Sequence, residues 1–317
     1  MKKGGILLAA TGWDSAVWSR MFAQEAPGRK VFVDPDGRTD DSVEYAIVWK
    51  QPAGSLAGLK NLKVIFSLGA GVDHVFRDPE VPDVPIVRVV SNDLTNRMSE
   101  YVAWQVLEHH RMGPKYRSQQ RDKLWLEDRN QPAAKDITVG MLGLGVLGSD
   151  AARKLKALGF SVTGWSRSPH ALAGVHTFHG ADQLPEFLSG VDVLVCLLPL
   201  TPATANLLAM PLFEKMTKRG PLGAPVLINA GRGGLQNEAD ILAALDNGIL
   251  SAVSLDVFNQ EPLPSHSPFW SHPNVTLTPH AAAASDPFAL VGPIVDQMDA
   301  FDRGEPLKNM VDRQHQY

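Results

Sequence analysis

Three charged residues follow three apolar runs in the second half of the chain: Arg232 in LINAGRGG, Glu261 in SLDVFNQEPLP and His280 in VTLTPHAAAAS. A guanidinium pairs with a carboxylate, and an imidazole can donate a proton to a developing alkoxide. A carboxylate beside the imidazole stabilises its protonated form. These residues together suit the reduction of a 2-oxo acid. Arg232 would grip or polarise the substrate, and His280 would act as general acid with Glu261 as its partner.

A glycine-rich turn in VGMLGLGVLGSDAARKLKALGF is typical of dinucleotide binding. Gly143 allows a tight turn, Gly145 lets the backbone approach a pyrophosphate, and Gly148 lets helix and strand pack closely. The turn follows an apolar run and opens an amphipathic segment, so the amides of Val146 and Leu147 would begin a helix facing the phosphates. The pattern therefore predicts that a dinucleotide binds here.

The residues that follow the next apolar run predict which nicotinamide cofactor is bound. An NAD site places an acidic residue there to bind the ribose 2′-hydroxyl, whereas this chain has Ser166, Arg167 and Ser168. Arg167 can pair with a 2′-phosphate, and the two hydroxyls can donate to it. We therefore expect NADP(H) rather than NAD(H).

Apolar runs alternate with helical patterns along the chain, which favours parallel sheets with crossover helices. The expected strands are residues 4–10, 30–33, 45–49, 63–69, 86–90, 137–142, 161–165, 191–198, 224–230, 251–257 and 274–279. The expected helices are 14–24, 98–113 and 237–248, with a further amphipathic stretch after residue 285. Residues 116–134 fit either an irregular arm or a second helix.

Two α/β domains follow from this pattern and from the length of 317 residues. The predicted fold has two doubly wound parallel-sheet domains, with a Rossmann cofactor domain inserted into a flavodoxin-like substrate domain. The substrate domain would take residues 1–100 and 285–317, and the cofactor domain residues 101–284.

Composition excludes several classes of function. A formal charge of -4 and a pI near 6.2 give no support for nucleic-acid binding. The N-terminal run MKKGGILLAATGW is too short for a membrane span and lacks the features of a signal peptide. The single cysteine, Cys196, lies in an apolar run and excludes a disulfide framework. We expect a cytoplasmic protein with no metal site.

The ordered set of motifs resembles the D-isomer-specific 2-hydroxyacid dehydrogenase family over essentially the whole chain. The motifs are GLGVLGSDAARKLKALGF, LLPLTPATANLL, LINAGRGG, LDVFNQEPLP and LTPHAAAAS. This resemblance implies that Arg232, Glu261 and His280 are catalytic. It implies a homodimer built through the long helix near 98–113, with the dimerisation helix and arm in the cofactor domain. It also implies small 2-oxo acids as substrates, with reduction of glyoxylate to glycolate and of hydroxypyruvate to D-glycerate.

The resemblance also implies binding residues. The loop SLGAGVDHV would hold the substrate carboxylate on backbone N–H groups, and a tryptophan would border the substrate pocket. Asp256 would orient the nicotinamide carboxamide. The implied substrate residues are Trp49, Leu68, Gly69, Ala70 and Gly71, and further cofactor contacts are Leu198, Pro199, Thr204 and Ala230.

Two alternatives stay open on the sequence. One is a dehydrogenase for a bulkier 2-hydroxy acid, which would need a larger pocket than Trp49 leaves. The other is a non-catalytic NADP(H)-sensing protein, because a fold alone does not specify catalysis.

Overall fold

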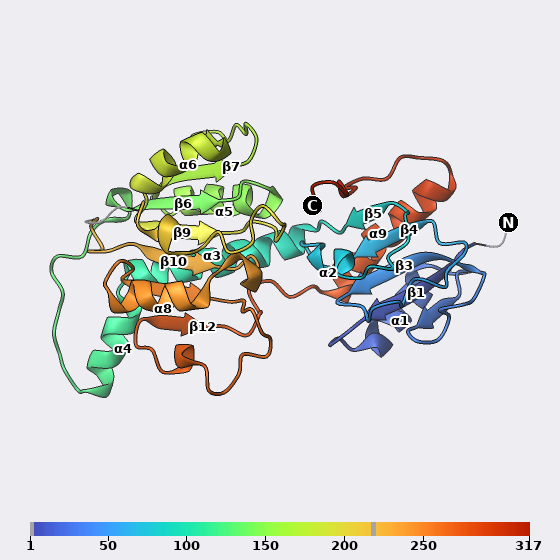
Figure 1. Cartoon of the computed structure of the whole chain (residues 1–317), viewed down its shortest axis with the longest axis horizontal. Helices are drawn as coiled ribbons and strands as arrows, with labels where there is room; N and C mark the ends of the chain where they lie inside the picture. The colour runs from blue at the N-terminus through green and yellow to red at the C-terminus, as the bar shows by residue number, and fades with distance from the viewer. Residues whose placement is uncertain (1–2, 217–219) are drawn as a thin grey trace. The chain divides into compact units, whose positions relative to one another are not determined.

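The protein, described here by a computed structural model over residues 3–216 and 220–317, divides into two compact units. Unit 1 runs to Leu94 and resumes at Ser285, and unit 2 comprises Thr95–Ala284. Figure 1 shows the C-terminal segment, in red, back among the blue strands of unit 1. The first crossing lies inside helix α3 (Asn92–His110), a few residues before the boundary at residue 100 that the sequence suggested.

Unit 1 contains a five-stranded sheet in the order β2-β1-β3-β4-β5, with every neighbouring pair parallel. This is the strand order of flavodoxin-like folds. The strands are β1 (Gly5–Ala10), β2 (Val31–Val33), β3 (Val43–Trp49), β4 (Val64–Ser67) and β5 (Ile86–Arg88). The helices are α1 (Ser15–Glu25), α2 (Asp73–Phe76) and α9 (Pro287–Asp302).

The sheet of unit 1 is buried on both faces, which explains why its strands read as largely apolar runs. Successive side chains alternate between faces. Ile6 and Leu8 pack in a core that α1 and α9 complete, whereas Leu7 and Ala9 pack in a second core.

The C-terminal helix α9 is anchored to unit 1 by a buried guanidinium. Arg29 Nη2 lies 2.7 Å from both Asp299 and Asp302, and Arg29 Nη1 donates to the carbonyl oxygen of Gly4. Tyr45 donates its hydroxyl to Asp302 at 2.5 Å. Charged groups removed from water in this way need partners, so the two carboxylates tie α9 to the sheet.

Unit 2 contains a seven-stranded sheet in the order β12-β11-β10-β9-β6-β7-β8, again with parallel neighbours. The strands are β6 (Thr138–Leu142), β7 (Ser161–Ser166), β8 (His176–His179), β9 (Val193–Cys196), β10 (Val226–Asn229), β11 (Ala252–Leu255) and β12 (Val275–Leu277). Besides α3, the helices are α4 (Gly113–Arg121), α5 (Val146–Ala157), α6 (Gly180–Ser189), α7 (Met210–Phe213) and α8 (Glu238–Asp246), with short 3-10 turns η1 (Ala134–Asp136), η2 (Gly233–Leu235) and η3 (Pro268–Trp270). The order from β6 outward is that of a Rossmann sheet, which confirms the predicted α/β class with two parallel sheets.

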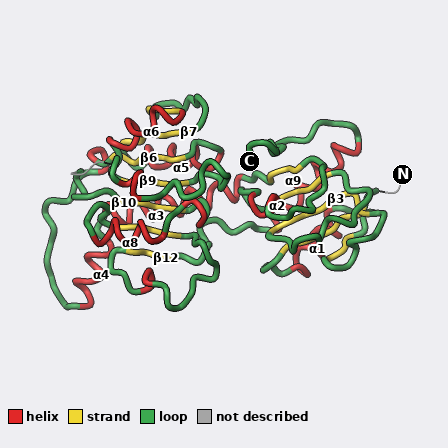
Figure 2. The backbone as a smooth tube through the Cα atoms, viewed as in Figure 1, coloured by secondary structure: helices red, strands yellow, loops and turns green. Residues whose placement is uncertain are grey.

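The segment after α3 differs from the sequence prediction. Gly113 begins α4 rather than ending the preceding helix, because Met112, at φ 57, turns the chain in a left-handed conformation. Residues 116–134 are part helix and part arm: α4 ends at Arg121, and residues 122–133 form no further helix or strand (Figure 2). Within residues 3–216 and 220–317, no helix is long and apolar enough to cross a membrane.

Candidate active site

The three predicted catalytic residues follow three neighbouring strands of unit 2. Arg232 follows β10, Glu261 follows β11 and His280 follows β12. Because these strands are adjacent and parallel, their carboxyl ends lie at one edge of the sheet, where open α/β sheets bind ligands. His280 Nδ1 lies 2.8 Å from Glu261 Oε2, and the two side chains are 27% and 23% exposed.

The contact with Glu261 determines which nitrogen of His280 can do chemistry. A carboxylate only accepts hydrogen bonds, so Nδ1 carries a proton and donates it to Oε2. The other oxygen, Oε1, accepts the backbone N–H of Phe258 at 3.2 Å, which fixes the carboxylate. Nε2 is therefore the atom of His280 that can give or take a proton, as in other carboxylate–imidazole pairs.

Asp256 holds the turn that carries His280. Its carboxylate accepts Thr278 Oγ1 at 2.7 Å and the N–H groups of Ala281 and Ala282 at 2.8 and 3.1 Å. Burial raises the pKa of Asp256, although these hydrogen bonds favour the carboxylate. His280 adopts a left-handed φ of 53, and its N–H donates to the carbonyl oxygen of Asp256. Non-glycine residues keep such a conformation where the surroundings enforce it. The expected contact of Asp256 with nicotinamide stays a prediction.

The loop of Arg232 depends on two buried amides that sequence reasoning missed. Asn229 Nδ2 donates to Gln236 Oε1 at 2.8 Å and to the carbonyl oxygen of Arg232 at 3.2 Å. Asn229 Oδ1 accepts Gly231 N–H, while Gln236 Nε2 donates to the carbonyl oxygen of Val257. Both amide side chains are fully buried. The signal available in the sequence was a pair of polar residues flanking AGRGGL directly after an apolar strand.

The three glycines of the predicted cofactor turn occupy three different environments. Gly143 has a φ of 110, and an added Cβ would lie 3.2 Å from the backbone of Leu197. A Cβ at Gly148 would overlap the carbonyl oxygen of Gly143, so helix and strand pack too closely for a side chain there. A Cβ at Gly145 would meet no protein atom within 4 Å. Open space at Gly145 fits the approach of a ligand.

The residues expected at the 2′-phosphate lie where β7 ends. Arg167 and Ser168 are exposed there, and the hydroxyl of Ser166 donates to the carbonyl oxygen of Ser168 at 2.8 Å. Elsewhere in the predicted cofactor site, the hydroxyl of Thr204 donates to the carbonyl oxygen of Pro199 at 2.7 Å. Val146 and Leu147 form the first turn of α5, Leu198 follows β9, and Ala230 follows β10.

The predicted carboxylate loop in unit 1 follows β4. Leu68 N–H donates to the carbonyl oxygen of Val48 at 3.0 Å, so this amide belongs to the sheet and cannot also hold a substrate. The amides of Gly69, Ala70 and Gly71 donate to no acceptor within the described chain. Backbone N–H groups without a protein acceptor can donate to a bound anion. This loop can therefore receive a carboxylate through Gly69 to Gly71 but not through Leu68.

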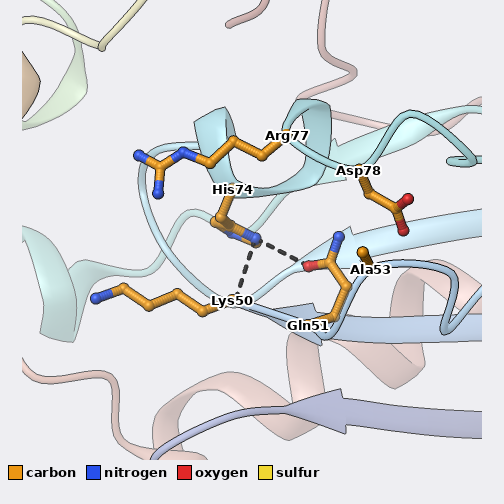
Figure 3. A pocket seen from close by; sticks show the side chains of 6 residues that line it. All are labelled: Lys50, Gln51, Ala53, His74, Arg77 and Asp78. Carbon is orange, nitrogen blue, oxygen red and sulfur yellow. Dashed lines mark hydrogen bonds between the residues drawn. The ribbon is translucent and has the colours of Figure 1, made fainter.

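The predicted pocket tryptophan, Trp49, ends β3 and lies directly on this loop. A Cβ at Gly69 would overlap the Trp49 ring, which leaves no room for a side chain at that position. Trp13 stacks on the ring with centroids 5.4 Å apart, and His74 meets it edge-on at 5.0 Å. Beside it, a cavity of about 200 Å³ is lined by Lys50, Gln51, Ala53, His74, Arg77 and Asp78 (Figure 3).

Comparison with known proteins identifies relatives of the whole chain. Residues 103–282 match the D-isomer specific 2-hydroxyacid dehydrogenase, NAD binding domain family. Glyoxylate/hydroxypyruvate reductase A of Yersinia enterocolitica is 41% identical over 276 residues, which cover 85% of this chain and 86% of the relative.

Two solved structures of relatives superimpose closely on the chain. One is an NADPH-dependent glyoxylate/hydroxypyruvate reductase from Sinorhizobium meliloti in complex with NADP and sulfate. It has a TM-score of 0.94 and 46% identity, covering 99% of this chain and 100% of its own. The other is a probable 2-hydroxyacid dehydrogenase from Rhizobium etli in complex with NADP, HEPES and L(+)-tartaric acid. It has a TM-score of 0.93 and 44% identity, covering 99% and 100% of the two chains.

Proposed function

Because this chain belongs to the D-isomer specific 2-hydroxyacid dehydrogenase family, we propose that it reduces small 2-oxo acids with NADPH. The substrates are glyoxylate, which gives glycolate, and hydroxypyruvate, which gives D-glycerate, as the names of its relatives suggest. The observation that carries the proposal is the 2.8 Å contact between His280 Nδ1 and Glu261. It leaves Nε2 of His280 to deliver the proton that carbonyl reduction requires.

The residues of unit 2 would hold the cofactor through the glycine turn and the end of β7. Open space at Gly145 accommodates a pyrophosphate beside the first turn of α5, and Arg167 with Ser168 provides a cation and a hydroxyl for a 2′-phosphate. When bound, NADPH supplies the hydride. Comparing kcat/KM for NADPH and NADH tests the cofactor assignment, and a preference for NADH would refute it.

The other residues bind the substrate and balance its charge. The amides of Gly69, Ala70 and Gly71 receive the carboxylate, and Arg232 pairs with it or polarises the carbonyl. His280, as an imidazolium with protons on both ring nitrogens, gives its Nε2 proton to the developing alkoxide, and Glu261 stabilises that imidazolium and holds the ring by accepting the hydrogen bond from Nδ1. Trp49 limits the space beside Gly69, which favours acids with a small group on the carbonyl carbon.

Loss of NADPH absorbance on mixing with glyoxylate or hydroxypyruvate tests the activity. The substitution His280→Gln should lower kcat by ~10²–10⁴, the usual contribution of a general acid, while the affinity for NADPH is retained. Unchanged kcat in this variant would refute the role of His280. Faster turnover of phenylpyruvate than of glyoxylate would favour a dehydrogenase for bulkier acids. Tight NADPH binding without turnover of any 2-oxo acid would favour a sensor.

We further propose that the protein is a homodimer that uses the arm of residues 122–133. Leu124 and Leu126 on the arm are 57% and 64% exposed, Trp125 is fully exposed, and Trp104 on α3 is half exposed. Exposed apolar groups gathered in one segment usually mark a protein interface. Light scattering should show a dimer, and Trp125→Glu should weaken it; a monomeric wild-type protein would contradict the proposal.

A cytoplasmic location is part of the same proposal. Cys196 is fully buried, and burial raises the pKa of its thiol to about 12. A lone buried thiol fits a protein that makes no use of an oxidising compartment. Cell fractionation tests the location.

A further inference from the structure

His74 on α2 links the substrate loop to Trp49. Its imidazole is buried, with Nε2 3.0 Å from Ser67 Oγ and Nδ1 3.2 Å from the backbone nitrogen of Lys50 (Figure 3 shows the second contact). The edge of the ring meets Trp49 with centroids 5.0 Å apart. Lys50 itself adopts a left-handed φ of 45 directly after Trp49. The histidine therefore contacts the ends of both β3 and β4.

The hydrogen-bond partners of His74 determine which of its ring nitrogens carries the proton. The backbone N–H of Lys50 can only donate, so Nδ1 is an acceptor and the ring proton lies on Nε2. Gln51 lies beside the same nitrogen, with Oε1 at 3.1 Å, and its Nε2 has no partner within the described residues. Turning this carboxamide over replaces the contact between two acceptors, Oε1 and Nδ1, with a hydrogen bond from a Gln51 N–H to Nδ1, which Nδ1 shares with the N–H of Lys50; this agrees with the same tautomer.

The proton on Nε2 determines the direction of the hydrogen bonds that run from His74 through Ser67 to the Gly69–Gly71 loop. Because Nε2 donates to Ser67 Oγ, the hydroxyl hydrogen of Ser67 is directed to a backbone carbonyl oxygen of the loop. The carbonyl oxygen of Gly71 lies 3.3 Å from Ser67 Oγ, and the carbonyl oxygen of Gly69 lies 3.5 Å from it. In a trans peptide, the C=O and the N–H point in opposite directions. A Gly71 carbonyl drawn toward Ser67 therefore turns the next N–H, that of Val72, away from it. The same holds for Gly69 and the N–H of Ala70.

We propose that His74 is a positioning residue for substrate binding: through Ser67 it aims the N–H of Ala70 in the Gly69–Gly71 loop, and through its ring it holds Trp49 on Gly69. This inference rests on the proposed function, because the loop receives the substrate carboxylate there. The relay from Nε2 through Ser67 Oγ to the carbonyl oxygen of Gly69 sets the direction of the Ala70 N–H, which has no acceptor among the described residues. Through the carbonyl oxygen of Gly71 it sets the direction of the Val72 N–H at the end of the loop. Preorganised donors of this kind bind an anion without reordering cost.

A matched pair of substitutions tests the relay. The amide nitrogen of glutamine lies near the place of Nε2, whereas that of asparagine lies near the place of Nδ1. His74→Gln keeps a donor for Ser67, and His74→Asn removes it, while both lose the ring beside Trp49. His74→Asn should raise KM for glyoxylate by about 3- to 10-fold relative to His74→Gln, the effect of one hydrogen bond, with kcat and the KM for NADPH nearly unchanged.

Ser67→Ala gives a second route to the same result if His74→Asn folds poorly. It should raise KM as His74→Asn does, and the double variant should be no worse than either, because both changes break one path. Equal KM values for His74→Asn, His74→Gln and wild type would overturn the relay while leaving the proposed function intact. A wild-type enzyme without turnover of any 2-oxo acid would instead overturn the proposed function, and this inference with it.

Discussion

Gly145 and Gly148 lie three residues apart in one turn, yet alanine should impair different properties at the two positions: NADPH binding at Gly145 and the stability of the fold at Gly148. Gly145 has φ -68 and ψ -167, an extended conformation open to any residue, and its added Cβ would meet no protein atom within 4 Å. At Gly148 the added Cβ would overlap the backbone oxygen of Gly143, and backbone cannot rotate aside as a flexible side chain can. Gly145→Ala should therefore spare the fold, and Gly148→Ala should not.

The expected magnitudes follow from these environments. The methyl group of Gly145→Ala enters the space we assign to the pyrophosphate, and overpacking of this kind costs ~1–3 kcal/mol. The dissociation constant of NADPH should then rise by about 5- to 150-fold. Gly148→Ala faces a similar overpacking cost within the protein, offset by up to ~1 kcal/mol from the better helix propensity of alanine. Its melting temperature should fall.

Fluorescence titration with NADPH and thermal melting of the cofactor-free protein separate the two outcomes. Gly190→Ala is the control, because its Cβ would also meet nothing within 4 Å and its φ of -106 suits alanine. It should change neither measurement. Wild-type NADPH affinity in Gly145→Ala would refute the placement of the pyrophosphate. Wild-type melting of Gly148→Ala would refute the packing argument.

Three further predictions concern stability and substrate binding. Burial lowers the pKa of His109 from 6.5 to about 4. The stability that its neutral form allows is therefore complete above pH 6.5 and is lost as pH falls toward 4. At ~1.4 kcal/mol per pH unit, the free energy of unfolding in urea should fall by about 3 kcal/mol more in wild type than in His109→Gln between pH 6.5 and pH 4, and equal losses would contradict this. Arg29→Met should lower the free energy of unfolding by ~2 kcal/mol, because it removes a charged donor from two carboxylates, whereas the exposed Lys3→Met should cost under ~1 kcal/mol; similar melting of the two variants would refute this. Gly69→Ala should displace Trp49 and raise KM for glyoxylate, and an unchanged KM would show that the ring does not shape the site.

The sheets of this fold were predictable because their strands are buried on both faces. The run 191–198 is apolar at every position except Asp192, and it contains β9 whichever face each side chain takes. The edge strand β8 was missed because HTFH is polar at both ends. Helix α6 was missed for a related reason: Pro185 interrupts a sequence pattern that otherwise fits a helix.

The reacting residues of the site were also more predictable than the contacts that hold the surrounding structure in place. Residue types at strand ends indicate Glu261 and His280, and their 2.8 Å contact confirms that they meet. The partners of Arg29 lie 270 and 273 positions away in the chain, beyond any local pattern. The role of Leu68 could not be predicted either, because only the register of β4 against β3 reveals that its backbone N–H is bonded within the sheet.

The split of unit 1 has a consequence for biosynthesis. A ribosome makes residues 95–284 before α9, so every strand of the seven-stranded sheet emerges from the exit tunnel before α9 does, while the five-stranded sheet still lacks the helix over one of its faces. Domains fold as units during synthesis, and exposed apolar surface invites misassembly. Unit 2, the nucleotide-binding half, should therefore fold first in the nascent chain. The uncovered face of β1, β3 and β4 should be the surface that depends most on chaperones until α9 packs on it and Asp299 and Asp302 pair with Arg29.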